Sequence, residues 1–230
     1  MKNPVLGLLF RVLFPTLGVY FLREYSSSFF ALLFFLFSFW FVYLKPPLNN
    51  RKFLVSSLGL VALPILLPLG GRGLEWLFLM LWALALFFLL GVKNLILLRR
   101  QSSYEAVHLI LIFGFSLLYL LGLLPLVSQI ILFLVFFLLF REFYLVSAPS
   151  YPQRLTLAAS LMAFVLVEVA WILSFSSINF LAGAALLALT VYLFHDLILH
   201  HFQGTLSRQI ILRNVTLFVV LSLILILLPA

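Results

Sequence analysis

Long apolar runs separated by short polar gaps fill almost the whole of this 230-residue chain. Most runs are close to the about 17–25 residues that an α-helix needs to cross the hydrocarbon core of a bilayer. The runs are continuously apolar, without the alternation typical of membrane β-barrel strands, so we expect helices. The pattern predicts an all-α, polytopic transmembrane helical bundle that forms a single transmembrane domain over residues 1–230. The nine predicted spans are residues 4–22, 28–44, 53–70, 74–92, 106–125, 128–146, 156–175, 178–199 and 210–228.

The Lys and Arg residues predict which way these spans face, because basic residues favour the cytoplasmic ends of membrane helices. Of the 14 basic residues, Arg11 lies inside the first span, while Arg23 and Arg72 lie in gaps on one side. All the others lie on the opposite side, before the first span or around every second gap. They are Lys2, Lys45, Arg51, Lys52, Lys93, Arg99, Arg100, Arg141, Arg154, Arg208 and Arg213. This asymmetry predicts a cytoplasmic N-terminus and an extracytoplasmic C-terminus in the cytoplasmic (inner) membrane of a cell.

The composition limits the classes of partner. Two thirds of the residues are hydrophobic (66%) and 9% are charged, so the lipid bilayer is the expected surroundings. The net charge of +8 is spread over short gaps instead of forming one patch, which argues against nucleic acid. A membrane or cytoplasmic protein partner would dock on the basic inner gaps. These gaps are residues 45–52, 93–104, 147–155 and 202–209.

The absence of cysteine excludes disulfides, thiolate metal sites and thiol nucleophiles, and we expect no cofactor.

Two ionisable residues lie inside predicted spans. Glu168 is about twelve residues into the seventh span, and Arg11 is about seven residues into the first span from the same side. The difference in depth is about 7–8 Å at a rise of 1.5 Å per residue, which a long Arg side chain or a helix tilt would reduce. Two interpretations stay open. The pair is either a site on a substrate or proton pathway, or a structural ion pair that locks the two helices together.

The third predicted span carries Pro64 and Pro68, followed by Gly70 and Gly71. Proline removes a backbone donor and kinks or ends a helix, so we expect the outer third of this span to be irregular. Transporters use broken helices to build binding sites, whereas a kinked helix end would have no function of its own.

Histidines gather at the end of the eighth span. Asp196 and His200 are four residues apart and should share one helix face, whereas His195 and His201 should point elsewhere. Together with His108 from the fifth span, these side chains are candidates for a mononuclear metal site. The alternative is a helix end at the membrane interface that carries ordinary amphipathic histidines. Gly204 predicts where an extension of this helix stops.

These features favour a transport or translocation protein, or the membrane subunit of such a system, that handles a small or lipidic substrate. A membrane scaffold subunit without a substrate site is one alternative. The other is a metal-dependent enzyme embedded at the cytoplasmic boundary. Because the chain has no soluble catalytic domain, we favour a protein that is not an enzyme.

Overall fold

The computed structural model describes residues 4–25, 28–46, 50–67, 72–96, 100–122, 128–147 and 152–227. The chain divides into two compact units, Met1–Leu111 and Ile112–Ala230, and each is described by itself. The boundary between the units falls inside one helix. The expectation of a single domain over residues 1–230 stays a prediction.

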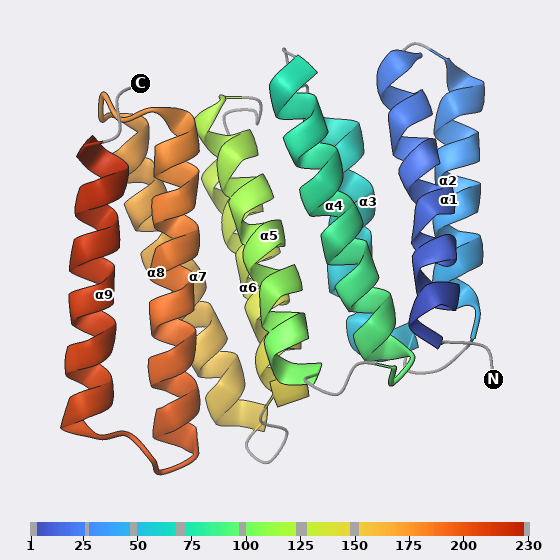
Figure 1. The fold of residues 1–230 in the computed structure, drawn as a ribbon. Helices are drawn as coiled ribbons and strands as arrows, with labels where there is room; N and C mark the ends of the chain where they lie inside the picture. The colour runs from blue at the N-terminus through green and yellow to red at the C-terminus, as the bar shows by residue number, and fades with distance from the viewer. Residues whose placement is uncertain are drawn as a thin grey trace. The chain divides into compact units, whose positions relative to one another are not determined.

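The described residues form α-helices and one short 3-10 helix (Figure 1). Within each unit, consecutive helices run in alternating directions. The elements are α1 (Pro4–Glu24), α2 (Phe29–Leu44), η1 (Asn50–Phe53), α3 (Leu54–Leu66), α4 (Arg72–Lys93), α5 (Arg100–Leu120), α6 (Ser128–Ser147), α7 (Pro152–Ser174), α8 (Phe180–Phe202) and α9 (Arg208–Leu227).

Seven of these helices are long and apolar enough to cross a membrane, so the prediction of an all-α, multi-pass membrane protein is confirmed. The other two helices are shorter than these seven. α2 has 16 residues. α3 has 13 and ends at Leu66, whereas the sequence predicted a span up to residue 70. Residues 68–71 lie outside the described residues.

Pro64 lies inside α3 and leaves one backbone carbonyl of this helix without its usual donor, which α4 replaces. Proline has no N–H, so the carbonyl of Leu60, one turn earlier, loses its usual helical donor. The indole Nε1 of Trp82 on α4 donates to this carbonyl at 2.7 Å. Trp82 is buried and packs against Phe35 and Phe39 of α2. The bond therefore lies at the centre of the first unit, where α2, α3 and α4 meet.

A buried lysine contacts the C-terminal end of α2. Lys93, the last residue of α4, is fully buried, and its Nζ donates to the carbonyls of Tyr43 and Pro46. A cation at a helix C-terminus offsets the negative end of the helix dipole and satisfies carbonyls that have no partner within the helix. Lys93 thus fastens the end of α4 to the end of α2.

Close packing joins α1 to α2. A Cβ atom at Gly18 would lie 2.9 Å from Oγ of Ser38 and 3.0 Å from Cα of Phe35. The absence of a side chain at Gly18 lets the two helices approach to this distance.

In the second unit, α7 packs against α6 and α8, and α8 packs against α9. His195 of α8 inserts among aromatic rings of α6, stacked on Phe143 with ring centroids 4.0 Å apart. Most of α9 is exposed on this unit, although Asn214 is buried. α8 ends at Phe202 and Gly204 follows with φ +67°, which confirms the predicted stop.

We expect Trp82→Phe to lower the free energy of unfolding by about 1–3 kcal/mol, because the buried Leu60 carbonyl loses its donor. Trp76→Phe is the matched control, since Trp76 is 54% exposed and lies on the same helix. Denaturation of the purified protein in mixed micelles would measure both. Equal losses in the two variants would contradict the proposed importance of the bond.

Candidate functional site

Glu168 lies on the face of α7 that its own unit leaves uncovered. The opposite face carries Ala159, Ala163 and Ala170, which are fully buried. The Glu168 side chain itself is half-buried. Among the residues that the structure describes, none forms a hydrogen bond or an ion pair with its carboxyl group. The carboxyl group therefore lies within a candidate membrane span, and the described residues of its own unit give it no hydrogen bond or ion pair.

This position is costly for a charge. An ionised carboxylate near the centre of a membrane helix costs about 2.5–3.5 kcal/mol even on permissive insertion scales. Glu168 lies in the second half of the span Gln153–Ser174 and so falls within the apolar layer. The carboxyl group therefore needs a polar partner that the described residues of this unit do not supply. A protonated carboxyl both donates and accepts a hydrogen bond.

Arg11, the predicted partner of Glu168, is exposed on α1. It belongs to the first unit and Glu168 to the second. Their pairing stays a prediction.

Asp196 is the centre of a polar network between α8 and α9. Its Oδ2 accepts hydrogen bonds from Nη2 of Arg213 at 3.1 Å and from Nδ2 of Asn214 at 2.5 Å. Its Oδ1 lies 3.5 Å from Nε2 of His200, which confirms that Asp196 and His200 share a face. The second ring nitrogen of His200, Nδ1, lies 2.8 Å from the hydroxyl of Thr205. The network fastens the α8–α9 hairpin.

The other histidines point elsewhere, as the sequence predicted for His195 and His201. His195 is buried against Phe140, Phe143 and Tyr144. His201 is exposed.

His108 is buried on α5, in the first unit. The described part of the chain contains no group of three or more His, Cys, Asp or Glu placed to hold a metal ion. A metal site built from His108, His195, Asp196, His200 and His201 stays a prediction.

Sequence reasoning missed Arg213 and Asn214 as partners of Asp196. Arg213 was counted only as a charge that orients the chain. The available signal was Asn214, an amide near the start of an otherwise apolar span and soon after the short turn that follows Asp196. A polar residue at such a position needs a partner at the same depth, and the end of the preceding helix is the nearest source.

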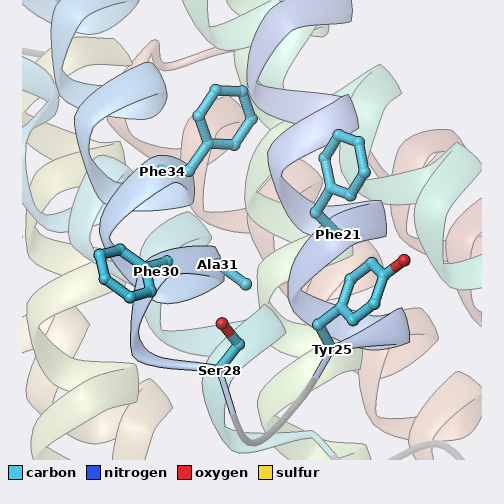
Figure 2. A pocket seen from close by; sticks show the side chains of 6 residues that line it. All are labelled: Phe21, Tyr25, Ser28, Phe30, Ala31 and Phe34. Atoms are coloured by element: carbon cyan, nitrogen blue, oxygen red, sulfur yellow. The ribbon is translucent and has the colours of Figure 1, made fainter.

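A second feature that the sequence did not predict is an open pocket of about 260 Å³ between α1 and α2. Aromatic side chains from the end of α1 and the start of α2 surround it (Figure 2). The lining residues are Phe21, Tyr25, Ser28, Phe30, Ala31 and Phe34. None of these is charged, so the pocket suits an apolar group, and its polar atoms are the hydroxyls of Tyr25 and Ser28.

The basic gaps differ in what they offer a partner. Arg51 and Lys52 are exposed, and exposed Lys45 lies over the ring of Phe41 at 4.4 Å. Lys93, in contrast, is fully buried. It serves the end of α2 and does not contribute to a docking surface. Residues 47–49, 97–99 and 148–151 of these gaps lie outside the described residues.

Comparison with known proteins finds no matching family model, no similar curated protein and no similar solved structure.

The two donors to Asp196 differ in burial, and we expect their removal to differ in cost. Asn214 is 2% exposed, whereas the Arg213 side chain is 59% exposed. Asn214→Ala should lower the free energy of unfolding by about 1.5–3 kcal/mol, typical of a buried hydrogen bond to a charged group. Arg213→Ala should cost at most about 1 kcal/mol. Denaturation in micelles compares the two, and a larger loss in Arg213→Ala would contradict this assignment.

Proposed function

We propose that the protein is a transport or translocation protein of the cytoplasmic membrane, or the membrane subunit of such a system. In this proposal Glu168 is the group that meets a small or lipidic substrate. The observation that carries the proposal is the carboxyl group of Glu168, which lies at membrane depth on an uncovered helix face. Its own unit supplies no hydrogen bond or ion pair to it among the described residues.

The chemistry of a carboxyl group in this position is binding and proton exchange. While neutral, it hydrogen-bonds a hydroxyl, an amide or an ester of the substrate. When it releases its proton, it becomes a counter-ion for a cationic group. Intramembrane ionisable residues commonly mark substrate or proton pathways for this reason.

A scaffold subunit is the second candidate, because the same outward position suits a contact with another membrane protein. In that case Glu168 would fix the register of two helices and would bind no substrate.

We further propose nine transmembrane spans, with the N-terminus in the cytoplasm and the C-terminus outside. Support for counting α2 and α3 as spans comes from the first unit. The end of α2 contacts the end of α4 through Lys93, and the middle of α3 contacts α4 through Trp82. Both short helices therefore lie alongside a helix long enough to cross the membrane.

Single-cysteine labelling tests this topology, because the natural chain has no cysteine. Arg51 and Ser177 are both exposed and lie in gaps that the proposal places on opposite sides. A membrane-impermeant maleimide should label Ser177→Cys in intact cells. It should label Arg51→Cys only after permeabilisation. Labelling of Arg51→Cys in intact cells would mean that α2 and α3 do not both cross.

Glu168→Gln tests the role of the carboxyl group in binding. We expect the variant to fold and to lose at least about tenfold of a co-purifying cationic ligand, because an amide keeps the hydrogen bonds of a neutral carboxyl group but not its negative charge, and a hydrogen bond to a charged group contributes about 1.5–3 kcal/mol. Mass spectrometry of lipids and small molecules bound to the protein in mild detergent measures this. Glu24→Gln is the control, since Glu24 is exposed at the end of α1.

An unchanged set of bound molecules in Glu168→Gln would remove Glu168 as the substrate site and favour the scaffold function.

A further inference from the structure

Three exposed basic residues lie between the end of α2 and the start of α3. Lys45 follows the last residue of α2, and Arg51 and Lys52 belong to η1. We call these three residues the 45–52 basic cluster. Within the described part of the chain, none of their side chains forms an ion pair.

A hydrogen bond brings the two parts of the cluster together. The hydroxyl of Tyr43 donates to the carbonyl of Asn50 at 2.6 Å. Tyr43 comes two residues before Lys45, and Asn50 directly precedes Arg51. The chain therefore returns to the end of α2 just before η1, and the positive charges gather there.

The cluster lies at the end of a candidate membrane span. Lys93 is the last residue of the span Leu74–Lys93, and its Nζ donates to the carbonyl of Pro46, which follows Lys45. The ammonium group of Lys45 lies 4.4 Å from the ring centroid of Phe41, one turn back along α2. The Lys45 side chain thus follows the apolar surface of the helix, and its charge lies where lipid headgroups meet the hydrocarbon.

The distribution of charge favours an anionic partner from outside the protein. Ten of the 14 basic residues and three of the six acidic residues lie in Met1–Leu111. Of these acidic residues, Glu24 ends α1 and Glu75 lies in the first turn of α4, so both belong to the opposite end of the unit from the cluster. Glu105 on α5 is the third. The second unit holds four basic and three acidic residues, so it has no excess of negative charge with which to neutralise the cluster.

An anionic phospholipid has both chemical parts that this surface requires. Its phosphate accepts charge-assisted hydrogen bonds from Lys and Arg, and basic residues directly beside a membrane helix attract anionic headgroups. Its acyl chains suit an apolar face of α2 that leads away from Lys45. This face consists of Phe37, Phe41 and Leu44, which are 68%, 48% and 49% exposed and recur at intervals of four and three residues.

We infer that the 45–52 basic cluster binds the headgroup of an anionic phospholipid, whose acyl chains lie against Phe37, Phe41 and Leu44. A transporter and a scaffold subunit would both retain such a site.

Native mass spectrometry of the full chain in mild detergent tests this site. The protein is titrated with phosphatidylglycerol or with phosphatidylcholine of the same acyl chains. The wild type should bind phosphatidylglycerol at least several-fold more tightly. Arg51→Gln/Lys52→Gln should weaken this binding by about fivefold for each charge removed and leave phosphatidylcholine binding unchanged.

Arg141→Gln/Arg208→Gln is the matched control, because it removes the same charge from exposed residues of the second unit. Its affinity for phosphatidylglycerol should fall by at most about twofold. Equal losses in the two double variants would mean that the lipid responds only to the overall charge, and would overturn the assignment of the site.

Lys45 separates the effect of charge from that of local structure. Lys45→Gln should weaken phosphatidylglycerol binding by about fivefold, whereas Lys45→Arg should bind as the wild type does. A wild type that does not prefer phosphatidylglycerol, or equal losses in the two Lys45 variants, would contradict the headgroup site. Displacement of the lipid by millimolar inorganic phosphate would assign the cluster to a free anion instead. Glu168→Gln should retain the bound phosphatidylglycerol, which distinguishes this site from the proposed substrate site.

Discussion

The constraint on which this structure depends is that a bilayer supplies no hydrogen bonds, so every backbone N–H and C=O in the apolar layer needs a partner from the protein. Continuous helices meet the constraint along most of the chain. Where Pro64 breaks the ladder, the indole of Trp82 supplies the missing donor to Leu60. Where α2 ends, the ammonium group of Lys93 supplies donors to Tyr43 and Pro46. In the first unit, side chains of α4 therefore contact α2 and α3 at carbonyl groups that have no donor within their own helix.

The same need for hydrogen-bond partners applies to the polar side chains of the second unit, and it distinguishes Asp196 from Glu168. Asp196 satisfies its carboxylate through Arg213 and Asn214, and in doing so joins α8 to α9. Glu168 does not follow this pattern, because its carboxyl group faces away from the packed side of α7. A carboxyl group without a hydrogen bond or ion pair among the described residues of its unit directs attention to what lies outside that unit. The proposed substrate answers this need.

Hydropathy predicted the helices well, because the length of an apolar run depends on bilayer thickness and needs no tertiary information. α3 was overestimated because apolar residues continue past Leu66, where the helix ends, and hydropathy alone does not register the end of a helix. Lys93 was interpreted as an orienting charge, since sequence position alone does not distinguish an exposed lysine from one that turns inward to a helix end. The face shared by Asp196 and His200 followed from helical spacing. Their partners on α9 did not, because those contacts depend on how the hairpin folds back.

The contacts of Lys93 and Trp82 have a consequence for the order in which the first unit is made. Lys93 follows Tyr43 by 50 residues, and Trp82 follows Leu60 by 22. Both donors reside on α4, the last helix that lies wholly in this unit. In the proposed nine-span topology, α2 and α3 therefore enter the membrane during synthesis with acceptors that the protein cannot yet satisfy. Translation of α4 supplies both donors. A nascent chain stopped before residue 82 would therefore leave the carbonyl groups on α2 and α3 without these donors, and a translocase or a chaperone would have to cover them.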